Sequence, residues 1–403
     1  MYLETRNDRW WYFLLKGDVG GSTVFFRVLK VFRWIFGDSF RTAQYNASQF
    51  IQLSCILILL RNVFKTISSK LEGVVGETAN IARMAELISS DIFKTFGWEV
   101  SGSMNINWNC VNSEHQRDTH PADVVYKYPE PYKDIITYVL CDLKSYSKTS
   151  INKNTIKKAI ENLNCSLSCA KVSTDWKEKY KDTDKNYNIK GMLFIYNHDG
   201  EFADNDQEFT KIISESTKNI KIDKGNCIFI VGPSLIKYLT NVSNNIKILQ
   251  ANSKLPLDKF KIGYYYPELE DRKLCHNTST LPLSIEHMSA NYQVMRYNQK
   301  DSNKIDGLDI YMKGNGGDEK SFMHAIDFIR KSNLLQEQTK VRVFVPSGSP
   351  EARRNFQKAM SLFTEDLEST LRERMQSLIT YEHCPVVVKQ QYFNEEIGMR
   401  YDK

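Results

Sequence analysis

The sequence predicts an α/β protein in which helices cover a mixed sheet. Two short, continuous apolar runs, GMLFIY at residues 191–196 and CIFIV at residues 227–231, are typical of strands buried on both faces. Segments with helical periodicity, at residues 80–96 and 154–170, alternate with strand-like pieces along the chain. Strands and helices mixed in this order indicate a layered α/β domain.

Composition limits the class of protein. The chain has 403 residues, 41% hydrophobic and 25% charged, which is typical of a soluble protein with two or three domains. The net charge of +6 is compatible with a polyanionic partner but does not require one. The most apolar run, CILILL at residues 55–60, is far shorter than the ~18 residues of a membrane span. With no signal sequence at residues 1–6 either, we expect a cytoplasmic protein without a membrane partner.

The cysteines and histidines form no recognisable framework. Eight cysteines are scattered without a C-x-x-C pair, and the seven histidines complete no zinc spacing. Reduced thiols are therefore expected, with neither a disulfide framework nor a structural zinc ion. His115 and His120 fall in a predicted polar loop.

The chain divides into three parts. Residues 1–70 are rich in aromatic and basic side chains and predict a helical segment, with helices at 22–36 and 47–67. Their high apolar content indicates packing on another domain or another subunit. Residues 71–240 carry the α/β pattern. Residues 241–403 predict an α+β accessory domain.

The last part has its own strands and helices. Residues 308–312 and 340–346 are typical of strands, and residues 321–332 and 351–380 of helices. Within the middle part, the highly charged residues 171–190 predict a solvated loop. The Gly-rich turn at residues 314–317 lacks the Gly-Lys-Ser/Thr ending of a phosphate loop, so we interpret it as a flexible turn.

A predicted hairpin carries the candidate chemistry. Strands at residues 122–128 and 135–143 flank the turn-like segment PEPYKD. A symmetric antiparallel hairpin around this turn places Asp123 opposite Asp142 at its open end. Side chains alternate with period two, so Asp142 and Lys144 share a face. Two acids and a lysine are thus expected to converge.

Such a cluster suits one kind of chemistry. Neighbouring carboxylates repel each other unless a cation lies between them, and oxygen ligands suit Mg²⁺ or Mn²⁺. A lysine beside them can orient a water molecule and stabilise charge on a phosphate. The bland alternatives are an exposed charge pattern for Asp142 and Lys144 and a turn cap for Asp123. For Glu86, an acid on the predicted helix at residues 80–96, the bland alternative is a solvated helix residue.

The ordered set of residues resembles the PD-(D/E)XK nuclease superfamily. Asp142-Leu143-Lys144 stands for its D-x-K triplet, and Pro121-Ala122-Asp123 is one residue looser than a strict Pro-Asp. Glu86, on the helix upstream of Gly97-Trp98, stands for the family's helix acid, with Glu77 as a more distant rival. The resemblance implies a restriction-endonuclease-like mixed-sheet core flanked by helices. It also implies a metal held by Glu86, Asp123, Asp142 and the Leu143 carbonyl.

The function implied is hydrolysis of DNA, with residues 241–403 serving assembly or DNA recognition. His115 and His120 either have a plain loop role or approach the scissile phosphate. We expect a Mg²⁺- or Mn²⁺-dependent endonuclease with little sequence specificity, because no base-reading motif is visible. Exposed lysines after the triplet are either contacts to the DNA backbone or solvated helix residues: Lys148, Lys153, Lys157 and Lys158. The layout resembles a nuclease subunit of a bacterial anti-phage defence system, working as a homo-oligomer or with a second subunit. The alternative is a non-catalytic scaffold or sensor subunit that retains a nuclease fold.

Overall fold

The structure, a computed structural model, describes most of the chain beyond its N-terminal part. The described residues are 83–202, 206–266, 281–298, 307–335 and 339–386. They belong to one compact unit that begins at Gly76. The helices expected at residues 22–36 and 47–67 lie outside the described residues. Among the residues described, no helix is long and apolar enough to cross a membrane.

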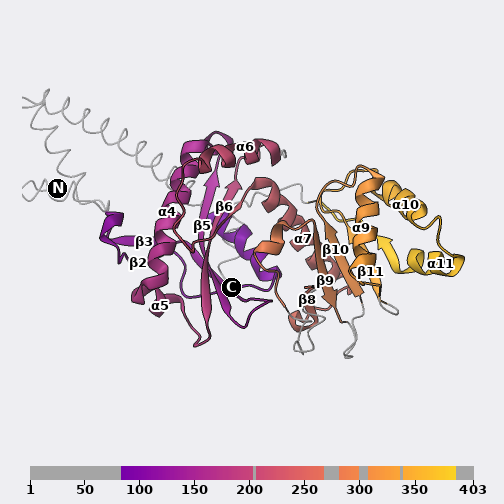
Figure 1. Ribbon diagram of the computed structural model, residues 1–403, viewed down its shortest axis with the longest axis horizontal. Coiled ribbons are helices and arrows are strands. Elements are labelled where there is room, and N and C mark those ends of the chain that lie inside the picture. The colour runs from indigo at the N-terminus through magenta and orange to yellow at the C-terminus, as the bar shows by residue number, and fades with distance from the viewer. Residues whose placement is uncertain (1–82, 203–205, 267–280, 299–306, 336–338, 387–403) are drawn as a thin grey trace, which may run out of the picture. The chain divides into compact units, whose positions relative to one another are not determined.

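The first sheet has five strands in the order β1-β4-β5-β6-β7. Strands β1, β4 and β5 are antiparallel neighbours, whereas β5, β6 and β7 are parallel. Helices α4 and α5 connect β5 to β6, and α6 connects β6 to β7 (Figure 1). The strands and helices are β1 (Glu99–Val100), β4 (Val124–Pro129), β5 (Ile136–Tyr146), α4 (Lys153–Val172), α5 (Thr174–Tyr180), β6 (Tyr187–Asn197), α6 (Asp206–Thr217) and β7 (Ile228–Val231).

The hairpin has the register that the sequence predicted. Val124 pairs with Cys141, so the next position outward sets Asp123 opposite Asp142. The turn closes where the Glu130 N–H donates to the Ile135 carbonyl oxygen. Because the pleat alternates, one residue of slip would turn both acids to the other face of the sheet.

Helices cover both faces of this sheet. On one face α4 packs through apolar side chains such as Ile160 and Leu167 onto Leu140 and Leu193. The other face is covered by the helix that includes residues 83–95 and by α7 (Pro233–Ala251). Apolar residues at three- and four-residue spacing on each helix make this burial possible. The result is the layered α/β arrangement expected from the sequence.

The prediction of a solvated loop at residues 171–190 is wrong. This segment contains α5 and the start of β6. Ser173 caps α5, because its hydroxyl accepts a hydrogen bond from the Trp176 N–H. Trp176 and Tyr180, one helical turn apart, are almost fully buried. The many charges around them obscured a single apolar pair with helical spacing.

A second five-stranded sheet follows, in the order β12-β11-β10-β9-β8. Strands β8, β9 and β10 are antiparallel, and β10, β11 and β12 are parallel, with α9, α10 and α11 in the crossovers. The elements are β8 (Ile262–Tyr264), β9 (Tyr292–Tyr297), β10 (Gly307–Met312), α9 (Glu319–Lys331), β11 (Lys340–Phe344), α10 (Ala352–Phe363), α11 (Ser369–Leu378) and β12 (Ile379–Tyr381).

The prediction of a single helix at residues 351–380 is wrong. The structure breaks it into α10 and α11 and ends it with strand β12. Arg372 holds the intervening turn, because its guanidinium donates to the carbonyl oxygens of Thr364 and Leu367. Tertiary pairing of β12 with β11 overrides the helical tendency at the end of the segment.

Helix α7 contacts the second sheet directly. The Tyr238 hydroxyl donates to the Tyr311 carbonyl oxygen over 3.1 Å, and the Asn241 amide donates to the Pro346 carbonyl oxygen over 2.8 Å. The expected boundary near residue 240 falls inside this helix. That boundary stays a prediction, and the chain on either side of it shares one apolar core.

A small two-stranded sheet stands beside the first sheet. It pairs β2 (Ile106–Asn109) with β3 (Thr119–Ala122), and a short 3-10 helix, η2 (Ser113–His115), lies between them. Strand β3 ends one residue before Asp123. A two-stranded ribbon of this size is marginally stable alone, so its position depends on what holds it to the rest of the domain.

Candidate active site

The two acids of the hairpin meet at its open end. Asp123 lies between β3 and β4, and Asp142 lies on β5 just beyond the last paired residues. The Asp123 carboxylate accepts a hydrogen bond of 2.6 Å from the Leu143 N–H. That bond fixes the Asp123 side chain against β5. The convergence predicted from the hairpin register is therefore present in the structure.

Lys144 completes the group. Its ammonium forms an ion pair with the Asp142 carboxylate, and the two side chains are 31% and 20% exposed. Burial is the largest single influence on the pKa of Lys144 and lowers it. The Asp142 and Asp123 carboxylates together outweigh burial, so the net pKa lies above its ordinary value. Lys144 is therefore charged at neutral pH and remains reachable from solvent, so the exposed-charge alternative does not describe this partly buried group.

The Asp123 carboxyl group is buried and lies close to a second carboxylate. The pKa of Asp123 is raised to about 6, mainly by burial and next by the charge of the nearby Asp142 carboxylate. The hydrogen bond from the Leu143 N–H acts in the opposite direction and lowers the pKa. Two carboxylates in this position are stabilised by a cation between them. A divalent ion with oxygen ligands fits this donor set, because its charge favours the ionised form of both carboxylates and offsets their repulsion.

The other two expected ligands lie close by. The Leu143 N–H faces Asp123, and in an extended strand the carbonyl of a residue points to the same side as its N–H. Glu86 accepts a hydrogen bond of 2.9 Å from the Asn105 side chain, and the Asn105 N–H donates to the Asp123 carbonyl oxygen. Glu86 also lies 3.7 Å from Arg83. It is thus connected to Asp123 through Asn105.

This part of the chain matches a known family. Residues 75–235 match the family model described as the GAPS4 protein PD-(D/E)XK nuclease domain. The resemblance to the PD-(D/E)XK superfamily is confirmed. The match covers less than half of the chain and includes the helix acid, the hairpin and the D-x-K triplet. No curated protein and no solved structure matches the chain.

Two residues of the PD-(D/E)XK domain escaped the sequence analysis. Tyr146 lies two positions beyond Lys144 on the same strand face, and the charges of Lys144 and Asp142 act on its hydroxyl. The same period-two argument that linked Asp142 to Lys144 points to it. Asn105, which connects Glu86 to Asp123, adopts a positive φ of 56° in the loop before β2. Nothing in its sequence context indicates that role.

The candidate DNA-binding lysines of the PD-(D/E)XK domain surround the start of α4. Lys148 is exposed in the short 3-10 helix η3 (Lys148–Ser150), and Lys153 and Lys158 are exposed on α4. Lys157 is half-buried and lies 3.8 Å from Glu161. All four follow the D-x-K strand directly, so they line the end of the sheet that carries the acids.

The expected histidine positions need correction. His120 does not lie in a polar loop, because it is fully buried on β3. His115 lies in η2, and its ring is edge-on to that of His120 with centroids 5.4 Å apart. Both rings group with two cysteine thiols rather than with the acids of the hairpin.

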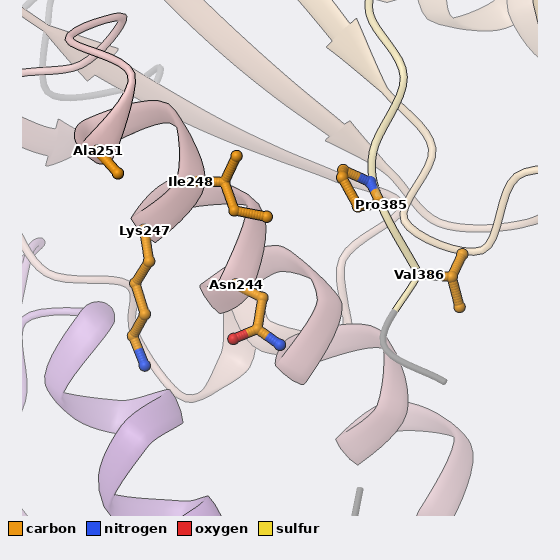
Figure 2. A pocket seen from close by; sticks show the side chains of 6 residues that line it. All are labelled: Asn244, Lys247, Ile248, Ala251, Pro385 and Val386. Atoms are coloured by element: carbon orange, nitrogen blue, oxygen red, sulfur yellow. The ribbon is translucent and has the colours of Figure 1, made fainter. Parts of the chain in front are cut away.

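A surface hollow of the protein lies elsewhere (Figure 2). Its volume is about 400 Å³, and it is lined by α7 and the chain after β12: Asn244, Lys247, Ile248, Ala251, Pro385 and Val386. No carboxylate lines it. Its lining is apolar apart from Asn244 and Lys247, and Lys247 lies 3.8 Å from Asp91. The hollow therefore lacks the carboxylates that converge at the hairpin.

The pKa of Asp123 predicts a pH dependence of metal binding. A carboxyl group with a pKa of about 6 is protonated below that pH, and the protonated form is a poor ligand. We expect Mg²⁺ affinity to fall roughly tenfold per pH unit below about pH 6 and to be nearly flat above about pH 7. Titration calorimetry of the protein with Mg²⁺ at several pH values measures this. Unchanged affinity down to about pH 5 would contradict the assigned group.

Proposed function

We propose that the protein is a Mg²⁺- or Mn²⁺-dependent endonuclease that hydrolyses DNA phosphodiester bonds. One observation carries this proposal: Asp123 and Asp142 converge, with Lys144 paired to Asp142, within a domain that matches a PD-(D/E)XK nuclease family. A scaffold subunit has no need for two adjacent carboxylates, one of which has its pKa raised to about 6 by burial and by the other's charge.

The residues have distinct roles in this proposal. Asp123, Asp142 and the Leu143 carbonyl hold the metal, and Glu86 is a further ligand or an orienting acid. A bound divalent ion polarises the phosphate and lowers the pKa of a coordinated water molecule. Lys144 stays protonated beside Asp142, so it donates hydrogen bonds that orient the attacking water and stabilise charge on the phosphate.

The lysines around the start of α4 are proposed to hold the DNA backbone. Lys148, Lys153 and Lys158 are exposed beside the D-x-K strand, so their ammonium groups can reach phosphates. Lys157 is already near Glu161, so it contributes less. Backbone contacts of this kind carry no sequence information, which supports cleavage with little sequence preference.

Replacing these three lysines with alanine tests their role. We expect the triple variant to bind DNA more weakly, and the slope of log affinity against log salt to fall by up to about 3 in magnitude. Lys218, Lys221 and Lys224 are matched controls, because they are exposed between α6 and β7, at the other end of the parallel strands. Fluorescence anisotropy at several salt concentrations measures both sets. Equal losses in both would remove the proposed DNA path.

The biological setting is proposed by analogy with the matched family and with the layout of the chain. We propose that the protein serves in anti-phage defence, as a homo-oligomer or with a second subunit. One PD-(D/E)XK core normally cuts one strand, so a double-strand break requires two cores. The apolar residues 1–70 are the proposed assembly segment.

One experiment tests the activity and its specificity together. The purified protein is incubated with linear, circular and single-stranded DNA, with Mg²⁺ and with EDTA, and the cut ends are sequenced. We expect breaks that disappear in EDTA and that share no recurring recognition sequence. One recurring sequence at the breaks contradicts the proposed specificity. No cleavage of any DNA, together with no Mg²⁺ binding, favours the scaffold alternative.

A further inference from the structure

Four potential metal ligands meet beside α4, away from the acids of the hairpin. They are Cys110, His115, His120 and Cys169, and one ligand atom from each lies within 4.8 Å of all the others. Cys110 directly follows β2, His115 ends η2, His120 lies on β3 and Cys169 lies in the last turns of α4. The spacing along the sequence predicted no zinc site, because Cys169 is far from the other three ligands.

Three of the distances between these atoms are close to those of a tetrahedral zinc site. The two sulfurs lie 3.6 Å apart, and the His115 Nδ1 lies 3.6 Å from Cys110 Sγ and 3.2 Å from Cys169 Sγ. A zinc ion with ordinary bond lengths separates two sulfurs by about 3.8 Å, and a sulfur from a nitrogen by about 3.5 Å. The observed separations agree with these values.

His120 provides an independent indication of a ligand. The side chain is fully buried, and its Nε2 has no hydrogen-bond partner in the described part of the chain. Its other nitrogen, Nδ1, lies 3.2 Å from the Ser166 hydroxyl. The Trp108 ring stacks on the His120 ring, with centroids 4.7 Å apart. Such contacts fix a metal-binding imidazole in orientation while one nitrogen stays available. A buried nitrogen without any partner is costly, and a metal ion removes that cost.

We propose that Cys110, His115, His120 and Cys169 bind one structural zinc ion. Two thiolates and two imidazoles in tetrahedral arrangement are a preferred zinc ligand set. All four ligand atoms lie within 4.8 Å of one another, close enough for one ion, whereas a two-iron cluster separates its cysteine pair from its histidine pair. With four protein ligands the shell is closed, so the ion has a structural role and leaves no position for a substrate.

The ion ties the small sheet to the nuclease core. Three ligands belong to the segment from Cys110 to His120, and the fourth belongs to α4. Other contacts of the small sheet are the packing of Trp108 and Ala122 in the apolar core and hydrogen bonds. The Arg117 guanidinium donates one to Asn162, and the Asn109 N–H donates one to Asp175. Because His120 lies three residues before Asp123, fixing β3 also fixes where that acid stands. The zinc site itself does not depend on the nuclease proposal.

Metal content tests the proposal directly. The full-length chain is purified in reductant without chelators, and its zinc is measured by elemental analysis. We expect about one zinc per chain in the wild type, and less than about a tenth of that in Cys110→Ser and in Cys169→Ser. Cys165→Ser is the matched control, because Cys165 lies one turn before Cys169 on α4 and outside the cluster. It should keep its zinc.

Two further measurements show whether zinc binding is independent of the acids of the hairpin, and whether a loss of zinc reflects a lost ligand or a misfolded variant. Asp142→Asn should keep about one zinc per chain even where it abolishes cleavage, so the two proposals fail independently. In the wild type, Co²⁺ exchanged for zinc should give visible bands of a tetrahedral ion with thiolate-to-cobalt charge transfer. This spectrum decides the matter if the serine variants prove insoluble.

Several outcomes would overturn the zinc site. One is a wild type that retains no zinc after incubation with zinc and desalting. Another is a Cys169→Ser variant that retains as much as the wild type. A Cys110–Cys169 disulfide in freshly purified, zinc-free protein would also overturn it, because oxidised sulfurs do not bind the ion.

Discussion

Asp142→Asn is expected to lower divalent-metal-dependent DNA cleavage by about a thousandfold or more. The change removes one of the two carboxylates that converge at the open end of the hairpin, and with it the partner of Lys144. Lys144→Met should have an effect of similar size, because it removes the charge that we propose orients the attacking water. Initial rates of plasmid nicking and linearisation in Mg²⁺ measure both variants.

The same hairpin provides matched controls. Asp134 and Lys185 lie 3.1 Å apart at its turn end, with side chains 91% and 58% exposed. Asp134→Asn and Lys185→Met repeat the two chemical changes without touching the site, so they should cleave at the wild-type rate. Circular dichroism spectra should be unchanged for all four variants. Cleavage at the wild-type rate by Asp142→Asn and Lys144→Met would show that the site is assigned wrongly.

Asp309→Asn is expected to destabilise the second sheet strongly. Asp309 on β10 is opposite Arg342 on β11, and the guanidinium donates two hydrogen bonds, of 2.6 and 2.8 Å, to the carboxylate. Asp309 is fully buried and Arg342 is 8% exposed. Burial raises the pKa of Asp309 to about 6, while Arg342 opposes that shift, so the pair is ionised at neutral pH.

Removing one charge leaves the other buried without its partner. We expect a loss of about 3–5 kcal/mol, which corresponds to a drop of more than about 6 °C in the melting temperature. Differential scanning fluorimetry measures it. Asp327→Asn is the control, because Asp327 pairs with Arg330 and Lys331 at the surface of α9, where ion pairs contribute little. This variant should melt at nearly the wild-type temperature.

A double variant separates charge burial from packing. Replacing both partners, as in Asp309→Leu with Arg342→Met, removes the unpaired charge and should recover much of the lost stability. The Arg342 side chain also lies over the Tyr297 ring at 5.0 Å, a contact that methionine partly replaces. If Asp309→Asn alone is as stable as the wild type, the predicted destabilisation is wrong, and water reaches the Asp309–Arg342 pair.

Some features were predictable because they depend on local pattern. The index symmetry of the hairpin predicted that Asp123 faces Asp142, and period two placed Lys144 beside Asp142. The helix at residues 154–170 appears as α4, because its apolar side chains recur at helical spacing. Each of these inferences needed only neighbours in the sequence or a short turn, and such neighbours are brought together by backbone geometry alone.

Other features depend on partners far along the chain. The helix predicted at residues 351–380 is divided because β12 pairs with β11. His120 looked like a loop residue, yet the stacking of Trp108 and the packing of α4 bury it.

The sequence by itself determined the α/β class and the acidic group of the hairpin, since both follow from periodicity and a short turn. Only the tertiary structure decided that Cys169 meets Cys110, His115 and His120. The reason is physical: α4 buries its apolar face on the sheet, and that burial sets where Cys169 lies, whereas the spacing of cysteines and histidines contains no trace of it.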